Sequence, residues 1–163
     1  MDISAYLDIE TTGLRYHESD MTVVGIHRED ETGRGVIQLV GKDINAAGIV
    51  KALEGVTRLF TYNGGRFDLP FIRAKLALDL LQYCCHEDLM HACWKRRLYG
   101  GLKSVERQLG IERRLPDVDG WAAVQLWNRY RKEGHRDSLM RLLEYNREDV
   151  LNLRVLREVL NRE

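Results

Sequence analysis

The segment from Ile3 to Leu14 constrains the fold more than any other stretch of the chain. Apolar residues occupy every second position from Ile3 to Ile9, while Asp8 and Glu10 fall on the opposite side of the same alternation. Because successive side chains of a β-strand point to opposite faces, both carboxylates lie on one face of the predicted strand. Like charges at this spacing repel each other, and burial increases the cost. The pair therefore requires protons, a basic partner or a metal ion, unless this face is simply exposed to solvent.

The rest of the chain is predicted to alternate between strands and helices and to end in a helical half. Patterning and turn residues predict further strands at residues 21–28, 35–40, 57–62 and 81–85, and helices at residues 43–54, 69–78, 88–98, 104–109, 121–132 and 138–160. Asp43 is expected to cap the first of these helices, and residues 29–33 to form the turn between the second and third strands. This order predicts an α/β fold with one mixed central sheet flanked by helices.

Composition is that of a globular chain with one hydrophobic core. The 163 residues are 44% hydrophobic and 31% charged, and we expect one domain over residues 1–163. The sequence contains no run of about 18 apolar residues and no secretory signal pattern, so we expect neither a membrane span nor secretion. Its cysteines are odd in number and clustered (Cys84, Cys85 and Cys93), which favours a reducing compartment and hence a cytoplasmic location.

The charge distribution permits a polyanionic substrate without requiring one. The formal net charge is zero, with an excess of acids in residues 1–70 and of bases in residues 71–163. Part of the acidic excess comes from Asp8, Glu10 and Asp68. Bound divalent cations would therefore make the surface more positive than the sequence alone indicates.

A second acidic motif is Asn63-Gly64-Gly65-Arg66-Phe67-Asp68, which lies between a predicted strand and a predicted helix. Asp68 follows the carboxyl end of that strand, where α/β sheets place their functional sites. Each polar residue also has a structural explanation. Asp68 is a suitable helix N-cap, and Asn63 is a common turn residue.

A third acidic motif is Tyr145-Asn146-Arg147-Glu148-Asp149 on the last predicted helix. Tyr145 and Asp149 are four residues apart and share one helix face. The alternative is an ordinary exposed polar patch. Taken together, the three motifs supply four carboxylates, and hard oxygen ligands of this kind suit Mg²⁺ or Mn²⁺. Two such ions can clamp the attacking and leaving oxygens of phosphoryl transfer.

These motifs resemble a known family. The sequences D-I-E-T-T-G-L, Y-N-G-G-R-F-D and Y-N-R-E-D are similar to the three exonuclease motifs of the DEDD superfamily, in the subgroup that has tyrosine in the third motif. The resemblance covers nearly the whole chain and implies an RNase H-like fold. The segment from Asp88 through the Gly100-Gly101-Leu102-Lys103-Ser104 stretch to Asp119-Gly120-Trp121 most resembles the YprB-like branch of predicted RNase H-like nucleases.

The resemblance implies a site and a reaction. Asp8, Glu10, Asp68 and Asp149 would bind two Mg²⁺ or Mn²⁺ ions, with Asp8 bridging both, Glu10 and Asp149 serving the ion that activates water, and Asp68 serving the second. Tyr145 would orient the attacking water, because a phenol with a pKa of about 10 is a poor base at neutral pH. The implied reaction is 3′→5′ exonucleolysis of single-stranded DNA or RNA, with release of nucleoside 5′-monophosphates.

The predicted substrate contacts lie close to the acidic motifs. They are Thr11, Thr12, Gly13, Leu14, Asn63, Phe67, Lys103 and Ser104. The first four would hold the terminal nucleotide, with Leu14 as a wedge against the base. Lys103 and Ser104 open a short helix and suit a phosphate contact. A simple loop, a core phenylalanine at residue 67 and a plain helix cap are the corresponding structural alternatives.

Other functions and sites remain as alternatives or are rejected. The expected partner is a single-stranded 3′ end of nucleic acid, with a possible protein partner for targeting and no membrane. The alternative functions are a non-catalytic nucleic-acid-binding or partner-binding module and an RNase H-like endonuclease. The sequence does not distinguish DNA from RNA. The cysteines and histidines at residues 84–93 lack zinc-ligand spacing. We expect Trp121 and Trp127 to serve packing.

Overall fold

The computed structural model describes residues 2–30 and 35–162. Its strands form a five-stranded sheet in the order β3-β2-β1-β4-β5. The strands are β1 (Ile3–Thr11), β2 (Met21–Glu29), β3 (Val36–Val40), β4 (Val56–Thr61) and β5 (Cys85–Asp88). β2 is antiparallel to both β1 and β3, whereas β4 is parallel to both β1 and β5. The sheet is therefore mixed, as predicted, and its central strand carries the first acidic motif.

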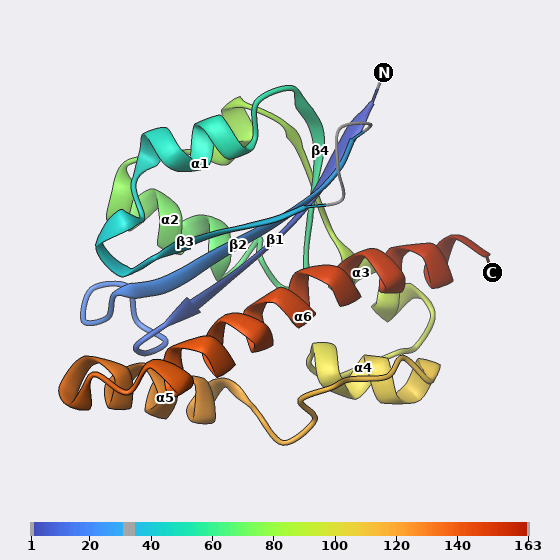
Figure 1. The fold of residues 1–163 in the computed structure, drawn as a ribbon. Coiled ribbons are helices and arrows are strands. Elements are labelled where there is room, and N and C mark those ends of the chain that lie inside the picture. The colour runs from blue at the N-terminus through green and yellow to red at the C-terminus, as the bar shows by residue number, and fades with distance from the viewer. Residues whose placement is uncertain (1, 31–34, 163) are drawn as a thin grey trace.

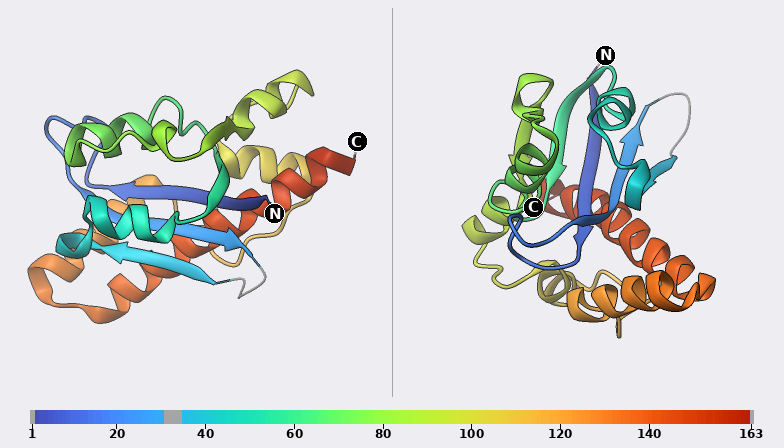
Figure 2. Two further views of the ribbon diagram at one scale, coloured as in Figure 1. Left: turned by 90° about the horizontal axis from the view of Figure 1, so that it is seen from above. Right: turned by 90° about the vertical axis from the view of Figure 1, so that its left-hand side faces the viewer.

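Helices cover both faces of the sheet (Figure 1). One face is covered by α1 (Ala46–Ala52) and α2 (Asp68–Leu76), and the other by α3 (Leu89–Lys95), α4 (Leu102–Leu109), α5 (Gly120–Glu133) and α6 (Arg136–Arg162). The two views of Figure 2 show α6 crossing the sheet diagonally with α5 beside it. This arrangement is the α/β architecture expected from the sequence, with one mixed central sheet flanked by helices.

The alternation along β1 divides the core into two layers. Ala5 and Leu7 are fully buried in the layer beneath α1 and α2. Tyr6, on the opposite face, is buried against residues of α3 and α6. Asp8 and Glu10 share the face of Tyr6, so the strand pattern directs both carboxylates toward α6. The predicted strand faces are thus confirmed, and helices cover most of this face.

Several predicted boundaries were wrong for local reasons. Asp43 does not cap the first helix, because it belongs to the 3₁₀ turn Gly41–Asp43. Asn45 is the cap instead, and its side-chain oxygen accepts a hydrogen bond of 2.8 Å from the amide of Gly48. The last strand begins at Cys85 instead of ending there, because a second 3₁₀ turn, Leu80–Gln82, occupies the predicted strand. Of the turn predicted at residues 29–33, residues 31–33 lie outside the described residues.

No helix within the described ranges combines the length and the hydrophobicity that crossing a bilayer requires. Cys84 and Cys93 are buried, Cys85 is exposed, and all three are free thiols.

Candidate active site

Three of the four predicted carboxylates meet where β1 passes beneath α6. Asp8 and Glu10 come from β1, and Asp149 comes from the middle of α6. One carboxylate oxygen of each lies within 4.8 Å of the others. Glu10 and Asp149 are buried, whereas Asp8 is partly exposed. Residues separated by about 140 positions thus form one acidic cluster, here defined as Asp8, Glu10 and Asp149.

Asp68 lies beside this cluster, and its carboxylate accepts a hydrogen bond from the main chain of β1. Its Oδ1 accepts a hydrogen bond of 2.9 Å from the backbone amide of Ile9, the residue between Asp8 and Glu10. Phe67, not Asp68, occupies the N-cap position of α2. The helix-cap explanation of Asp68 was therefore wrong, and its carboxylate ties the start of α2 to the acidic strand.

The electrostatics of these acids reflect buried negative charge. Burial raises the pKa of Asp8 and that of Glu10 well above the usual range, and repulsion from neighbouring carboxylates raises both further. Burial also raises the pKa of Asp68 to about 7. The pKa of Asp149 is raised to about 6 by burial, although the nearby Arg113 lowers it. All four acids consequently hold protons more tightly than exposed carboxyls do.

This donor set fits a hard divalent cation. Mg²⁺ and Mn²⁺ prefer carboxylate oxygens, and a cation placed among these oxygens would relieve the repulsion that raises their pKa values. The only cluster of three or more His, Cys, Asp or Glu side chains suited to a metal in residues 2–30 and 35–162 is Asp8, Glu10 and Asp149. The acidic cluster is therefore the candidate metal centre.

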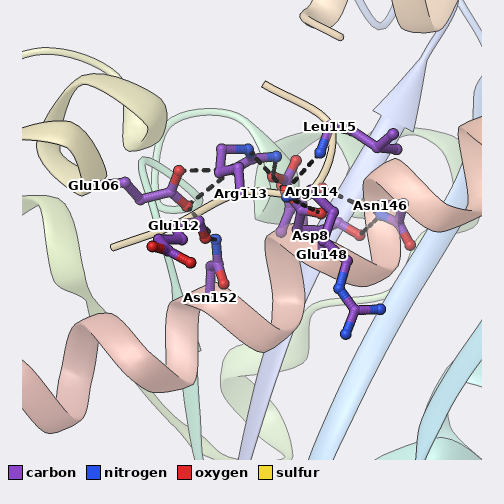
Figure 3. A network of polar contacts seen from close by, with 10 residues as sticks. Asp8, Glu106, Glu112, Arg113, Arg114, Leu115, Asn146, Glu148 and Asn152 are labelled. Atoms are coloured by element: carbon purple, nitrogen blue, oxygen red, sulfur yellow. Dashed lines mark hydrogen bonds and ion pairs between the residues drawn. The ribbon is translucent and has the colours of Figure 1, made fainter. Parts of the chain in front are cut away.

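The buried side chain of Arg113 borders the acidic cluster and belongs to the network of polar contacts in Figure 3. The guanidinium of Arg113 lies 2.5 Å from Oδ1 of Asp149 and 2.9 Å from both carboxylate oxygens of Glu106. It also lies 3.2 Å from Glu148, and its side chain is only 6% exposed. Asn152 completes the network with a bond of 3.0 Å to Glu106. Sequence reasoning missed Arg113, because its partners come from distant segments and give no spacing signal.

Tyr145 lies one helical turn before Asp149, with its side chain toward the same space. Its ring is close to two cations, the Nζ of Lys103 at 5.2 Å and the guanidinium carbon of Arg113 at 5.6 Å from the ring centroid. Burial raises the pKa of the Tyr145 hydroxyl above its ordinary value, and the charges of Asp149 and Glu10 raise it further. The hydroxyl is therefore a hydrogen-bond donor across the physiological pH range.

Two cavities meet at the acids and define a groove. The first, of about 580 Å³, is lined by Asp8, Glu10, Asp68, Tyr145 and Asp149 together with the predicted contacts Thr11, Thr12, Gly13, Leu14, Asn63 and Phe67. The second, of about 550 Å³, shares Asp8, Tyr145 and Asp149 with the first and continues past Asn63 to Gly100-Gly101-Leu102-Lys103. A polymer could therefore pass over the acids from one cavity into the other.

The loop that carries Asn63 is held in place by Asp88. One Asp88 oxygen accepts a bond of 2.8 Å from the amide of Asn63, and the other accepts 3.2 Å from Gly65. Asp88 also caps α3 through the amide of Met90. Asn63 has a positive φ of 60°, a conformation in which asparagine is favoured over most residues. The end of β4 is thus fixed toward the groove.

The structure does not place every predicted contact in the groove. Lys103 lines the second cavity, but Ser104 is absent from both linings. The hydroxyl of Ser104 lies 3.4 Å from the carbonyl of Tyr99, close enough for a weak local bond. Phe67 lines the first cavity and also packs against the core.

Trp121 was wrongly expected to serve packing. Its side chain is 73% exposed and lines the first cavity, together with Val124 and Gln125 of α5. Asp119 caps α5 through the amide of Ala122, which places Trp121 in the first helical turn, ahead of the core contacts. Trp127, in contrast, does pack against the core, as expected. No local sequence pattern distinguished Trp121, because its role depends on which side of α5 faces the groove.

Sequence comparison relates the chain to one family and one curated protein. A family model described as RNase H superfamily matches residues 5–161. The uncharacterized protein YprB of Bacillus subtilis (strain 168) is 31% identical over an alignment of 163 positions, which covers 91% of this chain and 39% of YprB. The chain therefore spans about two fifths of the length of this relative.

Comparison with solved structures gives a DNA polymerase and the protein NrnC. The family B DNA polymerase of the archaeon Pyrobaculum calidifontis is 18% identical, with a TM-score of 0.67 over 94% of this chain and 24% of the polymerase. Brucella melitensis NrnC bound to pGG is 23% identical, with a TM-score of 0.66 over 98% of this chain and 72% of NrnC. The same NrnC with bound Mg²⁺ is 24% identical, with a TM-score of 0.63 over the same shares. At these identities the likeness concerns the fold.

Proposed function

The chain belongs to the RNase H superfamily, and from this premise we propose that it is a divalent-metal-dependent 3′→5′ exonuclease of the tyrosine subgroup of the DEDD superfamily. It would act on single-stranded DNA or RNA and release nucleoside 5′-monophosphates. The observation that carries the proposal is the convergence of Asp8, Glu10 and Asp149 within 4.8 Å, beneath an open groove. The fold likeness to a polymerase and to NrnC supports it.

Asp8, Glu10 and Asp149 would hold the ions, and Asp68 would contribute from its place on the Ile9 amide. We propose two Mg²⁺ or Mn²⁺ ions, a choice that the Mg²⁺ bound in NrnC supports. When bound, such ions supply an acidified water nucleophile and charge stabilisation at the departing 3′ oxygen. Under this proposal the bound cations would take the place of the protons that the acids, with their raised pKa values, otherwise hold.

Tyr145 would orient the attacking water through its hydroxyl. The raised pKa of this group makes it a poor base, which leaves hydrogen bonding as its role. Tyr145 lines both cavities, and its ring lies 5.2 Å from the Nζ of Lys103, which supports such a role. Lys103 would pair with a backbone phosphate of the strand and, because its cation also contacts the ring, would help to fix the tyrosine.

The nucleotide at the 3′ end would occupy the first cavity. Leu14, which is 85% exposed, and Trp121, which is 73% exposed, both line this cavity and offer apolar surface to a base. Aromatic side chains stack on any base, so such a contact gives affinity without strong sequence preference. Thr11, Thr12 and Gly13 would meet the sugar and phosphate from the end of β1, and Asn63 and Phe67, which line the same cavity, would add further contacts.

The experiment that tests the proposal incubates the purified chain with Mg²⁺ or Mn²⁺ and single strands of DNA or RNA labelled at the 5′ end. A ladder of products shortened from the 3′ end, absent with a chelator and absent in Asp8→Ala, is expected. No shortening with either ion, or equal activity in Asp8→Ala, contradicts it. Circular single strands separate the alternatives, because an endonuclease cuts them and an exonuclease cannot. Strand binding without hydrolysis would indicate a non-catalytic binding module.

A further inference from the structure

Asn146 is a fully buried amide that contacts Asp8 twice. Its Nδ2 donates to the backbone carbonyl of Asp8 at 3.1 Å and to the Oδ2 of Asp8 at 3.2 Å (Figure 3). The residue is 0% exposed, so water cannot replace these bonds. A single side chain of α6 therefore fixes both the main chain and the carboxylate of Asp8 from the helix side.

The orientation of the Asn146 amide is determined by Gln38 on β3. The Nε2 of Gln38 donates to the backbone carbonyl of Leu143 at 2.7 Å and to the Oδ1 of Asn146 at 3.0 Å. A carbonyl can only accept, so Gln38 must present its nitrogen to Leu143. Asn146 then receives that nitrogen on its oxygen and must direct its own nitrogen toward Asp8. The carbonyl of Leu143 at one end and the oxygens of Asp8 at the other can only accept. They thus fix the direction in which the amides of Gln38 and Asn146 donate.

Gly25 provides the space that the amide occupies. It is the residue paired with Asp8 between β1 and β2. A Cβ atom at this position would lie 2.1 Å from the Oδ1 of Asn146, a distance that no side-chain atom tolerates. Glycine in a central strand is less favourable than alanine, so its presence here needs a packing reason, and Asn146 supplies one.

We propose that Gln38, Asn146 and Gly25 form an amide relay that positions the Asp8 carboxylate, with Asn146 as a positioning residue of the metal centre. The inference rests on the proposed function for the identity of that centre. The relay fixes the rotation of the Asp8 carboxylate because its Oδ2 accepts a hydrogen bond from Asn146. The amides of the relay are neutral and add no charge to the site. Residues that orient metal ligands in this way usually change metal affinity or activity by about 10- to 100-fold when they are replaced.

Gln38 offers the sharpest test, because it does not touch Asp8. In Gln38→Glu a carboxylate oxygen, which can only accept, replaces the nitrogen that faces Leu143 and Asn146, so the Asn146 amide must turn over and present its oxygen to Asp8. In Gln38→Met the side chain at residue 38 no longer imposes an orientation on the Asn146 amide. The Nδ2 of Asn146 can still donate to Asp8. A purely structural role for Gln38 predicts similar effects for the two variants, whereas the relay predicts a large difference.

The experiment measures Mn²⁺ binding by calorimetry without nucleic acid, and kcat and KM with a single strand. For Gln38→Glu we expect Mn²⁺ affinity and kcat to fall about tenfold or more with KM little changed, and for Gln38→Met less than about threefold. Gly25→Ala, which displaces Asn146 without adding charge, should resemble Gln38→Glu. The effect of Gln38→Glu should persist at high salt, because a turned amide is not screened as a distant charge would be.

Equal effects of Gln38→Glu and Gln38→Met, or recovery of Gln38→Glu at high salt, would overturn the relay. Melting temperatures identify any variant that fails to fold, in which case Gly25→Ala supplies the comparison. An unaltered protein that binds Mn²⁺ but degrades no strand contradicts the proposed function, while the calorimetric comparison still decides the relay. A protein that binds no Mn²⁺ overturns both.

Discussion

Arg113 pairs with Asp149 at 2.5 Å, and the same guanidinium pairs with Glu106 at 2.9 Å. One cation therefore faces three buried carboxylates, including Glu148 at 3.2 Å. The pairing links the irregular segment before α5 to both α4 and α6. The guanidinium of Arg113 also places a permanent positive charge beside one oxygen of Asp149. A metal ion would therefore bind a carboxylate whose position is already fixed.

Replacing Arg113 by methionine should destabilise the fold strongly. The change leaves Glu106, Glu148 and Asp149 buried without a cation, and removal of one partner from a buried ion pair costs about 3–5 kcal/mol. Urea denaturation at neutral pH measures the free energy of unfolding. Arg129→Met is the matched control, because its pair with Glu133 is exposed on α5 and should contribute about 0.5 kcal/mol or less. Similar losses in both variants would contradict the buried network.

Without metal, the stability of the protein should fall as the pH rises from about 5 to about 7.5. Burial raises the pKa of Asp68 to about 7 and that of Asp149 to about 6. Because both values exceed those of the unfolded chain, the folded state binds more protons in this window, and deprotonation favours unfolding. Scanning calorimetry in a chelator measures the slope, which Asp68→Asn should reduce. Saturating Mn²⁺ should reverse it, and a melting temperature that rises with pH in the chelator would exclude this account.

Asp8→Asn should separate stability from metal binding. The variant removes one of the repelling charges beside Glu10 and Asp149, and its amide oxygen can still accept from Asn146. We therefore expect a higher melting temperature than that of the unaltered protein when both lack metal. Mn²⁺ at a hundred times its Kd should stabilise the unaltered protein by about 2.7 kcal/mol and the variant far less. Thermal unfolding with and without Mn²⁺ checks both statements, and equal metal-induced shifts would refute them.

Much of the fold followed from local sequence patterns. The alternation in β1 identified the central strand and its polar face, because side-chain direction depends only on the strand itself. Boundaries that depend on competing caps were less predictable. Asp43 and Asn45 are both good caps, and only the 3₁₀ turn at Gly41–Asp43 decides between them.

The candidate site was predictable where motifs carry it and not where tertiary contacts do. Asp8, Glu10 and Asp149 were found from two of the three short motifs, and the structure brings them together. Arg113 and Trp121 were missed, since neither has a local pattern. The first depends on partners from α4 and α6, and the second depends on which side of α5 faces the groove.

Tyr145→Phe should lower kcat and leave the pH dependence of the reaction unchanged in shape. The hydroxyl would orient water and would not exchange its proton, because its pKa lies above the ordinary value of about 10. Loss of one orienting bond should cost about 10- to 100-fold in kcat. Steady-state rates between about pH 6 and 9 test this, since a catalytic base would make the unaltered enzyme, but not the variant, accelerate with rising pH. An alkaline limb confined to the unaltered enzyme would show that Tyr145 acts as a base.

Trp121→Ala should weaken substrate binding without weakening the fold. The side chain is 73% exposed, so its removal opens no core cavity, yet it lines the groove beside the acids. Base stacking contributes about 1–3 kcal/mol per base, which corresponds to a rise in KM of about 5- to 150-fold with kcat little changed. Trp121→Phe should recover most of the affinity, because a smaller aromatic ring still stacks.

Trp127→Ala is the matched control on the same helix. Trp127 packs against the core and over Gly41, so its loss should lower the free energy of unfolding by about 1–3 kcal/mol. Because its ring lies away from the acids, KM should change little in the fraction that remains folded. Kinetics with a single-stranded oligonucleotide, together with melting temperatures for both variants, separate the two roles. An unchanged KM in Trp121→Ala would remove this tryptophan from the substrate path and leave Leu14 as the exposed apolar contact of the first cavity.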